Sequence, residues 1–212
     1  HPNLAHFVTF DLAARPKPIL VMELVEGPSL ERMIDTLSLD MPRAIQALRD
    51  VAAGLTAMHE ADVGHLDLKP GNVLLRGGTT AVLVDFGLAG KKIRLGCGSA
   101  PYSAPEIWGH APAGARPTPM PADVYAFACL AFETLTAQIL FDADSEVALV
   151  SAHITHDGLP PKLRVLAADP RLLPLSELLF CALRRDPQAR LGIAELWAQL
   201  DKELAKLAGQ PW

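Results

Sequence analysis

Cysteine is scarce in this chain, whose 212 residues include only Cys97, Cys129 and Cys181. The number is odd, and the spacing shows none of the pairing that a disulfide framework would need. We therefore expect reduced thiols in a cytosolic protein, packed as small buried hydrophobic side chains.

Long apolar runs and basic stretches are also missing. No run approaches the ~20 apolar residues of a membrane span, and no signal peptide opens the chain. The net charge is -5 and no stretch interleaves basic with aromatic residues, so nucleic acid is not an expected partner. Because the chain begins at His1 without methionine, we expect a piece of a longer cytoplasmic protein or of the cytoplasmic part of a membrane-tethered one.

Half of the residues are apolar, which is enough for a well-formed core in one or two domains. The pattern predicts a mainly α-helical protein with a small β-hairpin region, an α+β fold. Strands are predicted over residues 7–10 and 19–25, helices over 28–34, 42–60, 123–132, 175–183 and 193–207, and an irregular surface loop over 109–121.

The densest chemistry lies in the stretch HLDLKPGNVLL, residues 65–75, followed by VLVDFG, residues 82–87. Two short apolar runs flank the glycine-containing connection RGGTT, which is typical of a β-hairpin. Antiparallel strands pair in register, so Asn72 before the first strand and Asp85 after the second are predicted to lie side by side.

Asp67 and Lys69 should face the same point. Pro70 disfavours a helical conformation for Lys69, and in an extended segment side chains two residues apart point the same way. Asn72 and Asp85 supply the oxygen ligands that Mg²⁺ takes in the company of phosphate. Lys69 can neutralise a phosphoryl oxygen, and Asp67 can accept a hydroxyl proton.

This stretch resembles the catalytic loop of eukaryotic-type Ser/Thr protein kinases, and Asp85-Phe86-Gly87 resembles the metal-binding triplet that follows that loop. The resemblance implies ATP-dependent phosphoryl transfer to Ser or Thr hydroxyls of protein substrates, with ATP and Mg²⁺ as cofactors. Asp67 and Lys69 would be the catalytic residues, and Asn72 and Asp85 the metal ligands.

The same resemblance implies a nucleotide site. Met22 would be the gatekeeper, residues 23–25 the hinge that pairs with adenine through backbone groups, Ser29 a neighbour of the ribose, and Leu74 the floor under the adenine ring. The implied cofactor-binding set is Met22, Glu23, Val25, Ser29, Lys69, Asn72, Leu74 and Asp85.

Further motifs extend the resemblance along the chain. His65 would pack on Phe86, and Ser99 would hydrogen-bond Asp67 and Lys69. Ser103-Ala104-Pro105-Glu106 resembles the Ala-Pro-Glu motif, whose glutamate would pair with Arg190. Asp123, which leads the apolar helix, would hold the backbone of the catalytic loop.

Two departures from the family pattern agree with each other. Leu66 stands where an arginine usually pairs with a phosphorylated activation-loop residue, and no Ser, Thr or Tyr lies between Gly87 and Gly98. We therefore predict an activity that does not depend on phosphorylation of this loop.

The glycine-rich phosphate loop, the strand lysine and the helix glutamate of the small lobe are not found in the chain. The resemblance therefore divides it into residues 1–25, the end of the small lobe with the hinge, and residues 26–212, the large lobe. Alone, these residues are expected to be inactive. Two alternatives stay open: a non-catalytic kinase-like binding module and a small-molecule phosphotransferase.

Three histidines outside the catalytic loop receive a plainer interpretation. His59, at the end of the helix over 42–60, is expected to cap that helix or lie on the surface. His153 and His156, with Asp157, could suggest a metal site, but without cysteines or a third ligand a surface placement is favoured.

Overall fold

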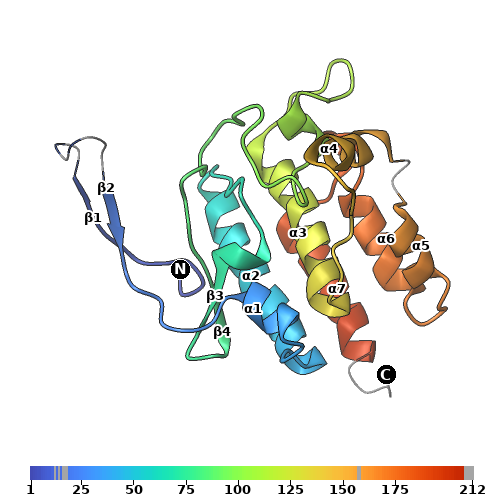
Figure 1. The fold of residues 1–212 in the computed structure, drawn as a ribbon, viewed down its shortest axis with the longest axis horizontal. Helices are drawn as coiled ribbons and strands as arrows, with labels where there is room; N and C mark the ends of the chain where they lie inside the picture. Colours follow the sequence, from blue (N-terminus) through green and yellow to red (C-terminus); the bar gives the residue numbers. More distant parts are fainter. Residues whose placement is uncertain (12, 14, 16–18, 157–158, 208–212) are drawn as a thin grey trace.

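The computed structural model describes residues 1–11, 13, 15, 19–156 and 159–207. In chain order its elements are β1 (Phe7–Asp11), β2 (Ile19–Met22), α1 (Leu30–Asp35), α2 (Met41–Glu60), the 3₁₀ turn η1 (Pro70–Asn72), β3 (Val73–Arg76), β4 (Thr80–Leu83), η2 (Pro105–Trp108), α3 (Pro119–Thr136), α4 (Glu146–Thr155), α5 (Pro161–Ala167), α6 (Leu173–Ala182), η3 (Pro187–Ala189) and α7 (Ile193–Leu207). Helices dominate, with two separate two-stranded antiparallel sheets, β1–β2 and β3–β4 (Figure 1). The mainly α, α+β prediction is confirmed.

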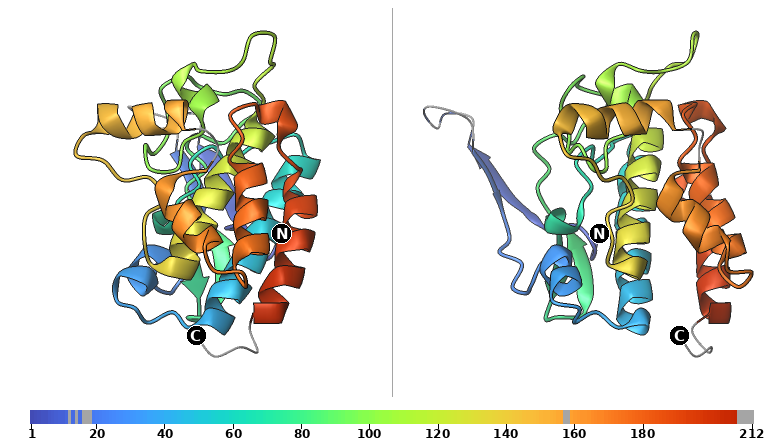
Figure 2. Two further views of the ribbon diagram at one scale, coloured as in Figure 1. Left: turned by 90° about the vertical axis from the view of Figure 1, so that its right-hand side faces the viewer. Right: turned by 45° about the vertical axis from the view of Figure 1, so that its right-hand side comes forward.

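Helix α3 is the centre of the core. Fourteen of its eighteen residues are buried, including the fully buried side chains of Tyr125 and Phe127. A helix that is apolar on every side must be surrounded. Helices α1, α2 and α6 pack against α3, and α7 packs in turn on α2 and α6 (Figure 2).

The β3–β4 hairpin lies against α2. At its open end it carries residues 65–72, called the catalytic loop after the kinase loop that they resemble. Val73 pairs with Leu83 and Arg76 with Thr80. The N–H of Val84 then donates to the carbonyl of Asn72 at 3.0 Å. This bond places residue 85 next to residue 72, as the hairpin pattern predicts.

The segment between β2 and α1 is held against β3 by a close backbone approach at Gly27. With φ +154°, a Cβ atom at this position would lie 1.9 Å from the carbonyl oxygen of Leu75, so only glycine fits. Leu75 N–H donates to Pro28 O at 2.8 Å, and Gly77 N–H to Glu26 O at 3.1 Å. The chain leaving β2 is therefore fixed beside the hairpin.

The β1–β2 hairpin projects from the helical body (Figures 1 and 2). Its apolar side chains are unusually exposed, with Phe7 at 56%, Phe10 at 49% and Ile19 at 51%, and Leu24 beyond it reaches 85%. Such a surface on a small two-stranded sheet is one that further strands or a partner would be expected to cover.

Several predicted boundaries shift. The second strand ends at Met22, because residues 23–25 leave the ladder. Helix α3 begins at Pro119, inside the predicted loop over 109–121, because proline is accommodated in a first turn. Helices α4 and α5 were not predicted. Ser145 caps α4 by accepting a bond from Ala148 N–H at 3.2 Å.

A search of the described residues for a membrane-crossing helix finds no helix that is long and apolar enough.

Candidate active site

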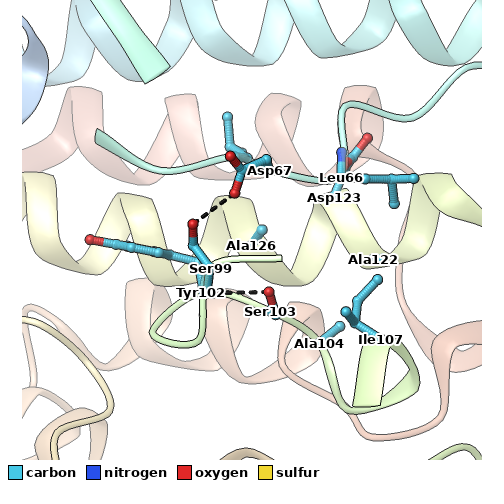
Figure 3. A pocket seen from close by; sticks show the side chains of 11 residues that line it. Leu66, Asp67, Ser99, Tyr102, Ser103, Ala104, Ile107, Ala122, Asp123 and Ala126 are labelled. Atoms are coloured by element: carbon cyan, nitrogen blue, oxygen red, sulfur yellow. Dashed lines mark hydrogen bonds between the residues drawn. The ribbon is translucent and has the colours of Figure 1, made fainter. Parts of the chain in front are cut away.

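Asp67 lies at the centre of a hydrogen-bonded group in the loop between α2 and β3. Its Oδ1 accepts a bond from the hydroxyl of Ser99 at 2.7 Å (Figure 3). Its Oδ2 accepts one from the Asn72 side-chain amide at 2.9 Å. Lys69 Nζ donates to Ser99 Oγ at 2.9 Å and lies 3.2 Å from Asp67 Oδ2. The predicted convergence of Asp67 and Lys69, and their contact with Ser99, are both observed.

Asn72 fixes the geometry of the loop. Besides the carboxylate, its side-chain nitrogen donates to the backbone carbonyl of Asp67 at 2.7 Å. Both recorded bonds use the amide nitrogen, so the amide oxygen is the atom left to act as a ligand. Asn72 is buried, whereas the Asp67 side chain keeps 13% of its surface exposed.

Asp123 supports this loop from α3. Its Oδ2 accepts bonds from His65 N–H at 2.7 Å and from the His59 ring at 2.9 Å, and its Oδ1 accepts one from Leu66 N–H at 2.8 Å. The side chain is fully buried. A buried carboxylate needs such partners, so the expected role of Asp123 in holding the loop backbone fits these contacts.

Two residues of the site adopt left-handed backbone conformations, Leu66 with φ +64° and Asp85 with φ +61°. This region is rare for residues other than glycine and costs roughly 1–3 kcal/mol when it is held by its surroundings. At Leu66 the bond to Asp123 holds the backbone. Strain of this kind gathers at functional sites.

The position of Asp85 suits a hard cation. Its carboxylate is exposed, and Oδ1 accepts a bond from Gly87 N–H at 3.2 Å. Together with Asn72 Oδ1 this gives an oxygen donor set, which is the set Mg²⁺ takes when phosphate supplies further ligands. The two residues therefore fit the predicted cation.

The ring of His65 is buried, and its centroid lies 5.5 Å from that of Phe86. Its Nε2 lies 3.1 Å from the carbonyl of Val84. His65 thus links the catalytic loop to the end of the hairpin, and the predicted packing on Phe86 is confirmed.

The implied adenine-site residues lie together. Met22, Leu74, Val84 and Phe86 pack against a small apolar cluster of Ala5, Val25 and Val82, separate from the main core. Ser29 forms an antiparallel bridge with Leu74 and caps α1 by accepting from Arg32 N–H at 3.2 Å.

Glu23 carries additional contacts that the sequence did not indicate. Its N–H donates to His6 O at 2.9 Å, and its carboxylate accepts from His6 N–H at 2.8 Å and from Arg76 at 2.5 Å. These bonds fix the segment after β2 to the strand β3.

Residues 98–102 are called the substrate-facing loop after the kinase loop that they resemble, and a buried ion pair lies shortly after them in the chain. Arg190 contacts Glu106 through two parallel bonds of 2.6 and 2.9 Å, and both charged groups are fully buried. Arg190 also donates to Pro121 O at 2.8 Å and to Arg184 O at 2.7 Å. The predicted pairing of Glu106 with Arg190 is observed.

Tyr102 and Glu133 form a contact that the sequence reasoning missed. The Tyr102 hydroxyl donates to Glu133 Oε2 at 2.7 Å. Burial raises the pKa of Glu133, and the hydrogen bond from Tyr102 opposes that rise. Burial, and then this bond, raise the pKa of Tyr102 far above its ordinary value. The pair ties the substrate-facing loop to the last turn of α3.

Three expectations from the sequence are wrong. His59 neither caps its helix nor lies on the surface, because its ring is 12% exposed and contacts Asp123. His153 is fully buried under aromatic side chains rather than on the surface. Cys97 is exposed, whereas Cys129 is buried and Cys181 is intermediate. Asp157, grouped with the histidines in the sequence, lies outside the described residues.

Comparison with known proteins agrees with this geometry. A family model described as the protein kinase domain matches residues 1–200. The chain is 30% identical over 211 residues to serine/threonine-protein kinase PknB of Mycobacterium tuberculosis, a match that covers 93% of this chain and 32% of that protein. PknH of Mycobacterium bovis is 38% identical over 143 residues, which cover 64% of this chain and 23% of PknH.

The loop around Asp67, held by the central helix α3, and the oxygen-bearing side chains of Asn72 and Asp85 at the end of the hairpin form the arrangement that the kinase resemblance predicts. The chain belongs to the protein kinase domain family. The matched part of the chain spans 32% of the length of PknB and 23% of the length of PknH.

Proposed function

We propose that this chain forms most of the catalytic domain of a Ser/Thr protein kinase, which transfers the terminal phosphoryl group of ATP to serine or threonine hydroxyls of protein substrates. The observation that carries the proposal is the Asp67 carboxylate. It already accepts a bond from the hydroxyl of Ser99 at 2.7 Å while Lys69 lies 3.2 Å away. A carboxylate that binds one hydroxyl in this way can bind and deprotonate another.

Each residue of the loop has a separate task in this proposal. Asp67 orients the attacking hydroxyl and accepts its proton, and Asn72 holds Asp67 in place through its amide nitrogen. Lys69 offers positive charge to the transferring group. Asn72 Oδ1 and Asp85 would hold Mg²⁺, which when bound neutralises charge on the phosphates.

The nucleotide would lie at the small apolar cluster. Met22, Val25 and Leu74 supply an apolar surface for adenine, and Ser29 lies beside Leu74 where a ribose would follow. The carbonyl of Glu23 would accept from the base. The family in general uses ATP and Mg²⁺, and the full set of contacts is our assignment.

We assign residues 1–25 to the end of a small lobe with the hinge, and residues 26–212 to the large lobe. The exposed apolar surface of the β1–β2 hairpin supports this division, because further strands of a small lobe would cover it. A cytoplasmic location is part of the proposal, since ATP is the phosphate donor and the described cysteines are unpaired.

The two alternative functions are a non-catalytic binding module and a small-molecule phosphotransferase. The hydrogen-bonded arrangement of Asp67, Lys69 and Asn72 favours catalysis over binding alone. The buried pair of Glu106 and Arg190 fixes a loop of the kind that faces a peptide, and this favours a protein substrate.

The test uses the protein as it is made from its whole gene. Mg²⁺-ATP binding and phosphate transfer are measured for the wild type and for Asp85→Asn, against a protein mixture and a panel of small hydroxyl compounds. We expect phosphoserine or phosphothreonine from the wild type, and a loss of ~100-fold or more in transfer in Asp85→Asn, because a metal ligand is removed. Nucleotide binding without phosphate transfer would support the non-catalytic binding module. Transfer to small molecules alone would support the small-molecule phosphotransferase.

A further inference from the structure

A buried histidine lies beneath the substrate-facing loop, outside the catalytic group. His153 in α4 is fully buried. Its Nδ1 lies 2.8 Å from the hydroxyl of Tyr125 in α3, and the same hydroxyl lies 3.2 Å from Nε2 of His156. The His153 ring packs on Phe141 with centroids 4.0 Å apart. The ring is thus fixed from two sides.

The second nitrogen of His153 has no hydrogen-bond partner. Among the described residues, Nε2 is one of two buried side-chain polar atoms without such a bond. The backbone carbonyls of Ala100 and Pro101 lie near enough to the ring to oppose, in small part, the lowering of its pKa by burial. Both belong to the substrate-facing loop, one and two residues after Ser99, which contacts Asp67.

The proton positions follow from the inventory of donors and acceptors. Burial keeps His153 neutral, with a pKa lowered to about 3. A neutral imidazole carries one N–H. If Nε2 carries it, Nδ1 accepts from the Tyr125 hydroxyl, and the Tyr125 oxygen can accept from His156. His156 Nε2, the Tyr125 hydroxyl and His153 Nδ1 are then joined by two hydrogen bonds. The remaining donor is the Nε2–H of His153, on the ring that lies near the loop carbonyls.

We propose that His153 is a positioning residue for peptide binding, whose Nε2–H donates to the backbone of the substrate-facing loop when a substrate draws that loop into place. The inference rests on the proposed protein kinase function. A buried donor without an acceptor is unfavourable, so the arrangement favours any loop position that completes the bond. Tyr125 and Phe141 hold the ring, and Ser99 and Tyr102 are held on either side of Ala100 and Pro101. Completing the bond therefore requires a local shift of the carbonyls of Ala100 and Pro101.

The first experiment measures steady-state phosphorylation of a protein substrate by the whole protein and three variants. His153→Leu should raise KM for the protein substrate about tenfold, the ordinary worth of one hydrogen bond. KM for ATP and kcat should change less than about twofold, because Asp67 and the nucleotide residues are not touched. His153→Gln, which keeps an N–H donor, should recover part of the loss. His110→Leu, on an exposed loop, is the matched control and should behave as the wild type.

The second experiment reads the loop without using activity. Hydrogen exchange reports the N–H groups of Tyr102 and Ser103, which both donate to Ser99 O, at 3.0 and 3.1 Å. Added peptide should slow their exchange in the wild type and much less in His153→Leu. Tyr125→Phe, which removes only the hydroxyl, should give an intermediate effect and guards against a His153→Leu variant that fails to fold.

The outcomes separate the two proposals. An unchanged KM for the protein substrate in His153→Leu, or exchange at Tyr102 and Ser103 that responds to peptide as in the wild type, overturns the role of His153. A fall in kcat and a rise in KM for ATP of similar size would also overturn it, because they indicate general damage. If the wild type transfers no phosphate to any protein, the proposed kinase function fails. The effect of added peptide on hydrogen exchange at Tyr102 and Ser103 still tests the contact between His153 and the loop in that case.

Discussion

At the scale of single residues, the buried carboxylate of Asp123 organises the catalytic loop. It accepts two backbone N–H bonds, from His65 and Leu66, and contacts the ring of His59. One of these N–H groups belongs to a residue with φ +64°. The carboxylate therefore satisfies buried donors and holds a strained backbone at the same position.

Asp123→Ala should destabilise the fold by ~3 kcal/mol or more, because at least two buried N–H groups lose their acceptor and each costs roughly 1–3 kcal/mol. Urea unfolding measures this loss. Asp62→Asn, in the exposed turn after α2, is the control and should change the free energy of unfolding by less than about 0.5 kcal/mol. A loss below 1 kcal/mol for Asp123→Ala would show that the loop does not depend on this carboxylate.

Much of this residue-level account was readable from the sequence. Asp67, Lys69, Asn72 and Asp85 lie in short segments where hairpin register and strand alternation fix side-chain direction, so local rules place them. The partners of Asp123 were only half predictable. Its bonds to the loop backbone follow from the kinase resemblance, but His59 is 64 residues distant in sequence and its ring reaches Asp123 through helix packing alone.

At the scale of elements, the substrate-facing loop is held between η2, α3, α4 and the chain before α7. The pair of Glu106 and Arg190 closes one end, and Tyr102 with Glu133 ties the other side to α3. Sequence motifs predicted the first contact. They did not predict the second, nor helix α4. Its histidine, His153, resembles a surface residue in the sequence, and only the fold shows that Phe141 and Tyr125 pack against it.

Glu106→Gln should lower the free energy of unfolding by ~3 to 5 kcal/mol, because it leaves the guanidinium of Arg190 buried without a counter-charge. Thermal and urea unfolding of Glu106→Gln, Arg190→Met and the double variant give the coupling between the two residues. The double variant should be more stable than the sum of the two losses predicts. Strict additivity, or single losses near zero, would contradict a buried pair.

The pH dependence of stability should carry the signature of His153. Burial lowers its folded-state pKa to about 3, so between pH 6.5 and 3 the unfolded chain binds more protons than the folded one. Stability then falls as the pH falls, by at most about 1.4 kcal/mol per pH unit from this group. The groups around it are His156, Tyr125 and, beyond Tyr125, the pair of Arg190 and Glu106.

Urea unfolding of the wild type and of His153→Leu between pH 7.5 and 4.5 isolates this contribution. The slope below pH 6.5 should be shallower in His153→Leu, and the slopes above pH 7 should agree. Parallel curves over the whole range would mean that His153 titrates normally in the folded protein.

At the scale of the whole molecule, Asp67 links two segments that are far apart in sequence, since one carboxylate oxygen bonds Asn72, just before β3, and the other bonds Ser99. The family membership and the mainly helical fold were predictable, because the motifs recur in order over nearly the whole chain. The β1–β2 hairpin was also predicted, but its projection from the helical body was not. The exposure of its apolar side chains depends on which elements pack around it, and the sequence pattern of a strand does not reveal those neighbours.

Activity should not depend on phosphorylation of the segment between Asp85 and Ser99. Leu66 stands where an arginine would pair with a phosphorylated residue, but it is 8% exposed and packs in the main core. Residues 88–97 contain no hydroxyl side chain that could be phosphorylated. Phosphatase-treated and untreated wild-type protein should therefore transfer phosphate at the same rate. A phosphate located in this segment by mass spectrometry, with activity lost on its removal, would contradict the prediction.

The central claim is that Asp67 deprotonates a protein hydroxyl, and its most direct test is the rate of phosphate transfer to a protein substrate by the whole protein and its Asp67→Asn variant. The variant should retain nucleotide binding and lose ~10²- to 10⁴-fold in kcat, the usual contribution of a general base. Asp62→Asn, the same change at an exposed turn, should keep the wild-type rate. Transfer at the wild-type rate by Asp67→Asn would contradict the claim.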